Sequence, residues 1–134
     1  MEMDYTAPSK PLSSPSGVVI LLNGFPGVGK YSIGCKLFKL FDPKHARFID
    51  NHLLTDPVQA ITPGRETDHK ALRRTFRQVA FDALTAIEDA STTLMFTSCL
   101  SSSEEDQQVF EEYLAIACRC QVPFYLINIS CDRK

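Results

Sequence analysis

VVILLNGFPGVGK, residues 18–30, joins a continuous apolar run to a glycine-rich turn that ends in a lysine. The run is rich in β-branched residues, which is typical of a strand buried on both faces of a parallel sheet. The turn fits the pattern GxxxxGK, in which glycines allow backbone N–H groups to wrap around an anion. A helix that begins at the turn would add its positive end. The stretch therefore predicts a phosphate-binding loop, with a tight turn that binds no ligand as the alternative.

The residues of this loop have separate expected roles. Lys30 is expected to reach the β- and γ-phosphate oxygens of a nucleotide as a point charge, while the backbone amides surround the phosphates. A dinucleotide-binding turn is disfavoured, because its third glycine would fall at position 32, which is Ser32. The predicted nucleotide-binding residues are Gly24, Phe25, Pro26, Gly27, Val28, Gly29, Lys30, Tyr31 and Ser32.

The residue after the loop lysine departs from the usual pattern. That position normally carries Ser or Thr, whose hydroxyl binds Mg²⁺. Here it is Tyr31, and a tyrosine hydroxyl lies too far from the backbone to replace that short ligand. Ser32 follows one step later, about 100° further around the helix, and it is the candidate metal ligand.

Strands and helices alternate along the rest of the chain. A polar linker with Pro57, Pro63 and Gly64 is predicted after the second strand, which ends at Asp50. The alternation predicts an α/β fold with three layers, in which helices cover both faces of a parallel sheet. The predicted strands are 18–22, 47–49, 92–99 and 123–131, and the predicted helices are 32–41, 67–89 and a third that begins at Ser102 or Ser103.

Apolar stripes predict which side of each helix faces the core. Ser102 or Ser103 is the expected N-cap of the third helix, paired in a capping box with Glu105 or Asp106. The arginines of the second helix fall largely outside its stripe, so a solvated face is favoured over contact with an anionic substrate. The stripe of the first helix is Ile33, Leu37, Leu40 and Phe41, and that of the third is Val109, Phe110, Tyr113, Leu114 and Ala117. The stripe of the second helix is Leu72, Phe76, Val79, Ala80, Ala83, Leu84 and Ile87. The arginines outside the stripe are Arg65, Arg73, Arg74 and Arg77.

Length and composition limit the class of protein. The chain has 134 residues, enough for one domain, and residues 1–16 are rich in Pro and Ser, which predicts a disordered tail before a domain at 17–134. The formal net charge of −2 argues against a nucleic-acid binder that relies on bulk positive charge. No signal sequence or membrane-spanning run is apparent, and the five cysteines form no CxxC pair. We therefore expect a cytoplasmic protein with reduced thiols.

The segments LLNGFPGVGK (21–30) and FIDNHLL (48–54) resemble the P-loop small-molecule kinases, which include gluconate, shikimate and nucleoside-monophosphate kinases. The resemblance implies the cofactors ATP and Mg²⁺ and transfer of the γ-phosphate to a small-molecule acceptor. It also implies the strand order 2-3-1-4-5 and makes Lys30 and Asp50 the catalytic candidates. Asp50 would be the general base, and a turn or helix cap is its alternative role. The residues expected near the acceptor are Asp50, His52 and Arg74.

The sequence departs from this family in two further places. The third strand offers Thr97 and Ser98 where many P-loop enzymes end in an aspartate, and the chain stops after the segment 123–131, before the family's arginine-bearing lid and fifth strand. We therefore expect a fold that is incomplete at its C-terminus, with an exposed edge strand that could pair with another chain. Two alternatives to a kinase stay open, namely a nucleotide-binding fragment or regulatory domain without catalysis, and a weak nucleotide hydrolase.

Overall fold

The structure is a computed structural model that describes residues 17–131. The tail predicted for residues 1–16 lies outside the described residues. The elements, in chain order, are β1 (Val19–Asn23), α1 (Lys30–Phe38), the 3₁₀ turn η1 (Pro43–His45), β2 (Ala46–Ile49), α2 (His52–Ile61), α3 (Thr67–Thr85), β3 (Thr93–Ser98), α4 (Glu104–Cys120) and β4 (Phe124–Asn128).

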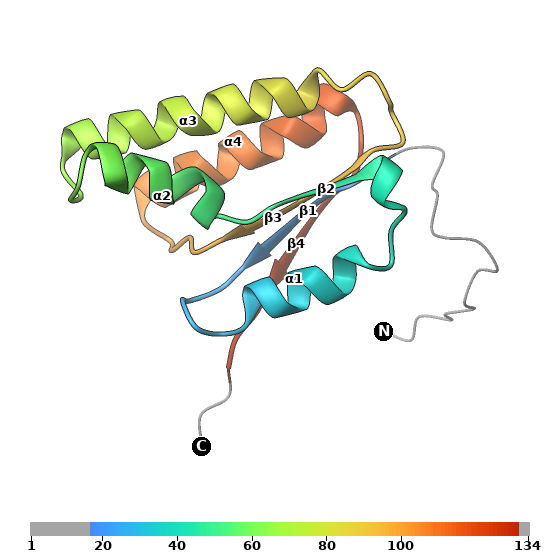
Figure 1. Cartoon of the computed structure of the whole chain (residues 1–134), viewed down its shortest axis with the longest axis horizontal. Helices are drawn as coiled ribbons and strands as arrows, with labels where there is room; N and C mark the ends of the chain where they lie inside the picture. The colour runs from blue at the N-terminus through green and yellow to red at the C-terminus, as the bar shows by residue number, and fades with distance from the viewer. Residues whose placement is uncertain (1–16, 132–134) are drawn as a thin grey trace.

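The four strands form one parallel sheet in the order β2-β3-β1-β4. Helix α1 covers one face of the sheet, and α3 and α4 lie side by side on the other face (Figure 1). The predicted three-layer α/β fold with a parallel sheet is therefore confirmed. The order of these four strands also agrees with the order that the family resemblance implies.

The core is built on both faces of β1 and β3. One cluster, beneath α3 and α4, contains Leu21 of β1 and an aromatic group of Phe81, Phe96 and Tyr113, whose ring centroids lie 4.9–5.5 Å apart. A smaller cluster on the α1 side is formed by Ile20, Leu22 and Met95. Burial on both faces explains why the β1 sequence is continuously apolar instead of alternating.

The apolar stripe predicted for helix α1 is confirmed in part, because Leu37 and Phe41 pack against the core. The only residue of the helix that is fully buried is Gly34, which lies against the ring of Phe48 on β2. Ile33 and Leu40, which the apolar stripe placed in the core, are exposed. The helix ends at Phe38, so residue 40 no longer follows the helical stripe. The inward side is set by the close approach of Gly34 to the sheet.

The polar linker predicted after β2 is wrong, because residues 52–61 form helix α2 with Pro57 inside it. Pro57 removes one backbone hydrogen bond, but Leu54 and Val58 lie one turn apart and are buried. The α2 helix packs against α3. Burial of this apolar pair explains the helix, since tertiary packing overrides a local propensity.

Helix α3 has neighbours on two sides, which the single apolar stripe did not predict. Val79, expected in the core, is 66% exposed, whereas the side chain of Arg77, expected outside the core, is only 12% exposed. Arg77 Nη2 lies 2.9 Å from Glu112 Oε2 of α4. Because α4 lies beside α3, this pair is buried between the two helices. The adjacent Arg73 is also partly buried, and desolvation lowers its pKa.

The start of α4 is determined by a serine cap. Ser103 is the N-cap, and its Oγ accepts a hydrogen bond from the Asp106 backbone N–H. This confirms Ser103 of the two candidates. The reciprocal half of the capping box is replaced, because the Asp106 carboxylate accepts from the backbone N–H and hydroxyl of Ser101. Three acidic residues in the first turn also complement the helix dipole.

Strand β4 lies at one edge of the described sheet. Tyr125, Leu126 and Ile127 are between 40% and 55% exposed on this strand. Pairing of this edge with another chain stays a prediction. Within residues 17–131, none of the helices has both the length and the apolar character needed to span a bilayer.

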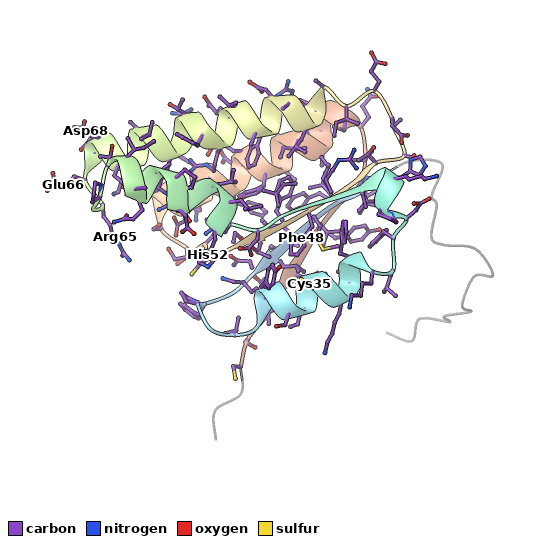
Figure 2. All side chains as sticks on the ribbon, viewed as in Figure 1. Cys35, Phe48, His52, Arg65, Glu66 and Asp68 are labelled. Atoms are coloured by element: carbon purple, nitrogen blue, oxygen red, sulfur yellow. The ribbon has the colours of Figure 1, made fainter. Side chains whose placement is uncertain are left out.

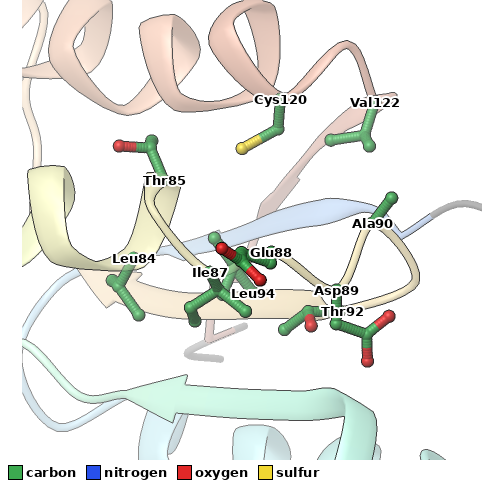
Figure 3. A pocket seen from close by; sticks show the side chains of 10 residues that line it. All are labelled: Leu84, Thr85, Ile87, Glu88, Asp89, Ala90, Thr92, Leu94, Cys120 and Val122. Atoms are coloured by element: carbon green, nitrogen blue, oxygen red, sulfur yellow. The ribbon is translucent and has the colours of Figure 1, made fainter.

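A small hollow of about 130 Å³ lies at the end of the sheet where β3 begins (Figure 3). The hollow is therefore far from the glycine-rich loop, which follows the opposite end of β1. Beside it, Ser91 and Asp89 both contact the Nδ1 atom of His45. The serine and the aspartate of a hydrolase triad bind opposite nitrogens of the histidine ring, so this cluster does not have the geometry of such a triad. The hydrogen bonds instead connect the turn before β2 to the loop before β3. The bonds from Ser91 and His45 also lower the pKa of Asp89 to about 2.

A Gly34→Ala substitution tests the packing of α1. A Cβ atom at this position would lie 2.5 Å from Phe48 Cζ, and such overpacking costs about 1–3 kcal/mol. Helix propensity alone would instead stabilise the variant by about 1 kcal/mol. We expect urea denaturation to show a lower free energy of unfolding. A more stable variant would contradict this packing, and Lys36→Ala on the exposed side of α1 is the matched control.

Candidate phosphate-binding site

The glycine-rich loop connects the end of β1 to the beginning of α1. Gly27 and Gly29 have φ angles of 83° and 92°, in the left-handed region that glycine adopts without strain. A Cβ atom at either position would meet nothing within 4 Å. These two glycines are therefore required by backbone conformation and not by lack of space. Gly29 is also the N-cap of α1, so the loop lies at the positive end of that helix.

Gly24, the first residue of the loop, is required for a different reason. A Cβ atom there would lie 2.6 Å from the carbonyl oxygen of Ile129, in the segment that follows β4. Two chain segments thus approach each other closely under the loop. This close approach depends on the neighbouring position of β1 and β4, which the strand order implied by the family resemblance includes.

Lys30 is the first residue of α1, and its side chain folds back over the loop. Its Nζ atom donates a hydrogen bond to the carbonyl oxygen of Gly24. The ammonium group therefore lies across the loop that the glycines form. An anion bound to the loop amides would meet this positive charge directly.

Asn23, the last residue of β1, was not among the predicted site residues. Its Oδ1 accepts hydrogen bonds from Ser98 Oγ, at 2.9 Å, and from the Leu100 N–H, at 2.7 Å. Its Nδ2 donates to the Leu100 carbonyl and to Asn128 Oδ1, both at 3.2 Å. Asn23 thus joins the ends of three strands directly before the loop. A polar amide at the end of a buried strand, next to the glycines, is the sequence signal that could have identified it.

Asp50 follows β2 at the same edge of the sheet. Its Oδ1 accepts a hydrogen bond of 2.6 Å from Thr97 Oγ1 of β3, and its Oδ2 accepts one of 3.3 Å from the His52 N–H. Thr97 Oγ1 in turn accepts from the Asn51 N–H at 2.8 Å. Asp50 therefore caps the turn into α2, as one of its two alternatives predicted, and the same bonds hold its half-buried carboxylate in place. Its role as a general base stays a prediction.

The other two residues expected near the acceptor are more exposed. The side chain of His52 is 76% exposed, with its ring 3.7 Å from Asp56, and Figure 2 shows it at the beginning of α2. Arg74 Nε lies 3.8 Å from Glu112 Oε1 of α4. Arg65 lies at the turn between α2 and α3 (Figure 2). The structure thus brings Asp50 to the edge where the loop lies, while Arg74 is directed to α4.

Tyr31 turns away from the loop and toward β2. Its ring stacks on Phe48 with a centroid distance of 6.0 Å and an interplanar angle of 20°. A hydrogen bond with Cys35, one turn further along α1, raises the pKa of the Tyr31 hydroxyl. Figure 2 labels Cys35 on α1 and Phe48 on β2. The tyrosine ring is therefore directed toward β2 and not over the phosphate loop.

Comparison with known proteins supports the fold. No protein-family model matches the sequence, and no curated protein matches it. A candidate kinase from Chloroflexus aurantiacus has a similar structure, with a TM-score of 0.60 and 10% identity over 85% of this chain and 59% of that protein. The APS kinase CysC of Mycobacterium tuberculosis aligns with a TM-score of 0.54 and 18% identity, over 87% of this chain and 77% of the other. The chain therefore has a P-loop kinase-like fold, and it spans about three fifths of the first of these two proteins.

Proposed function

We propose that the chain binds ATP and belongs to the kinases that transfer the γ-phosphate to a small-molecule acceptor. The observation that carries this proposal is the geometry of the loop. Left-handed glycines at positions 27 and 29 turn the chain into the N-terminus of α1, and Lys30 lies across that turn. This combination binds phosphate through amides, a helix dipole and a lysine. The amides of residues 27–32 and Lys30 would hold the phosphates, and the two kinases of similar fold support a nucleotide as the ligand.

Asp50 is the proposed general base of the transfer. The carboxyl ends of parallel strands lie on the same side of a sheet. Asp50 after β2 and the loop after β1 therefore lie on that side, with β3 between their strands. Phosphoryl transfer depends mainly on positioning and charge stabilisation. As the acceptor oxygen forms its bond to the γ-phosphorus and the bond to ADP breaks, Asp50 would take the acceptor proton. The hydrogen bond from Thr97 would hold the carboxylate for this role, with His52 and Arg74 as the proposed acceptor contacts.

Nucleotide binding without transfer is the second candidate function. The observation that favours it is Tyr31, which occupies the position where related loops carry a short hydroxyl residue. Its ring packs on Phe48 and contributes nothing to the loop. The two candidates share the same nucleotide site and differ only in catalysis.

The nucleotide site is tested by titrating ATP into the wild-type protein and a Lys30→Ala variant by isothermal calorimetry. Because a charge-assisted contact to phosphate is lost, we expect the Kd of the variant to rise by about tenfold or more. Lys36→Ala removes an equal charge from the exposed side of the same helix, and its Kd should match the wild type. Equally weak binding by all three proteins would contradict the proposed site.

Catalysis is tested with Asp50→Asn, which keeps the acceptor atom for Thr97 but removes the base. ADP release is measured over a panel of sugar, polyol and nucleoside hydroxyl compounds. We expect the acceptor-stimulated rate to fall by about 10²–10⁴-fold, while the Kd for ATP stays near the wild-type value. ATP binding by the wild type without stimulated ADP release would instead support the second candidate function.

A further inference from the structure

The first turn of α1 lacks the metal ligand that usually follows the loop lysine. In a loop of this kind, a Ser or Thr hydroxyl at that position coordinates the Mg²⁺ that accompanies the nucleotide. Tyr31 takes the position here, and its ring stacks roughly parallel to that of Phe48 of β2, with the centroids 6.0 Å apart. Cys35, one turn further along α1, raises the pKa of the Tyr31 hydroxyl. Tyr31 therefore does not present a short hydroxyl to the phosphates.

Two neighbouring hydroxyl groups at the carboxyl ends of the strands are already engaged. Ser98 Oγ at the end of β3 donates to Asn23, and Thr97 Oγ1 donates to Asp50. Both of these residues are buried. Across residues 17–131, no group of three or more His, Cys, Asp or Glu side chains could hold a metal ion. Ser32 is exposed in the same turn, but it lies about 100° further around the helix than the usual ligand. The residue that directly follows Lys30 therefore does not fit a protein-held Mg²⁺ site of the usual kind.

The loop nevertheless offers several phosphate-binding groups that do not require a metal. The amides around Gly27 and Gly29, the N-terminus of α1 and the Lys30 ammonium all offer positive charge to an anion. Mg²⁺ keeps most of its water ligands and commonly binds through the phosphates of the substrate itself. A loop that does not place a ligand at the usual position gains no affinity from the presence of Mg²⁺.

We propose that this loop binds the triphosphate of ATP independently of Mg²⁺, because Tyr31 has replaced the metal-binding hydroxyl. The inference rests on the proposed nucleotide site, and it concerns only how that site holds its ligand. It separates this chain from P-loop proteins whose nucleotide affinity depends on the metal.

The test is calorimetric titration of ATP in excess EDTA and in excess Mg²⁺. We expect the affinity of the wild type to be no greater with Mg²⁺ than with EDTA. A Tyr31→Ser variant supplies the missing short hydroxyl, and its affinity should become tighter in Mg²⁺ by about tenfold, or 1.4 kcal/mol. Tyr31→Phe keeps the ring on Phe48 but removes the hydroxyl, so it should behave like the wild type. Because Tyr31 is 61% exposed, these variants should fold, and circular dichroism checks that they do.

Several results would overturn the proposal. Wild-type binding that is tenfold tighter in Mg²⁺ would contradict it directly. Loss of that metal dependence in Ser32→Ala would then identify Ser32 as the ligand, and loss in Tyr31→Phe would identify the phenol. A Tyr31→Ser variant that stays indifferent to Mg²⁺ would refute the role assigned to Tyr31. ATP binding in neither condition would overturn the nucleotide site itself and this inference with it, whereas binding that responds to Lys30→Ala but requires Mg²⁺ would overturn the inference alone.

Discussion

Strand β1 is hydrogen-bonded along both edges, to β3 and to β4, and the side chains of Val19, Leu21 and Leu22 are completely buried on its two faces. The position of the loop depends on this constraint, because the loop begins where β1 ends. Asn23 then joins β1 to the segments after β3 and to β4 through its amide. The loop therefore starts from a point that is fixed by both neighbouring strands. Its own backbone then needs the two left-handed glycines and the close approach that Gly24 allows.

The parallel arrangement also explains why separate parts of the chain meet at one edge. Asp50 follows β2, Thr97 lies near the end of β3, and the loop follows β1. The carboxyl ends of these three strands lie together. The hydrogen bond between Thr97 and Asp50 connects two of these strands. An α/β sheet of this kind binds ligands outside the carboxyl ends of its strands, so the positive loop and the acidic Asp50 lie where a phosphate donor and an acceptor would be brought together.

Several structural features could be predicted because they depend on neighbours along the chain. The buried run of β1, the glycine turn and the N-cap at Ser103 are local patterns, and the structure confirms each of them as an element or a cap. The helix at 52–61 could not be predicted, because Pro57 argues against it and only the packing of α2 on α3 offsets that penalty. Val79 is exposed and Arg77 is buried, opposite to the expectation, for a similar reason. Helix α4 packs beside α3 and buries the ion pair of Arg77 with Glu112.

The amino-acid order alone was sufficient for the α/β class, for the loop and for the oddity of Tyr31 after Lys30, since each rests on residues adjacent in the chain. The tertiary structure decided which groups share the site. The network of Asn23 and the bond from Thr97 to Asp50 join residues that are 47 or more positions apart in the chain. It also decided where the Tyr31 side chain goes, because the stacking partner Phe48 comes from β2. Pairing between distant strands brings such residues together, and no local pattern in a single sequence records it.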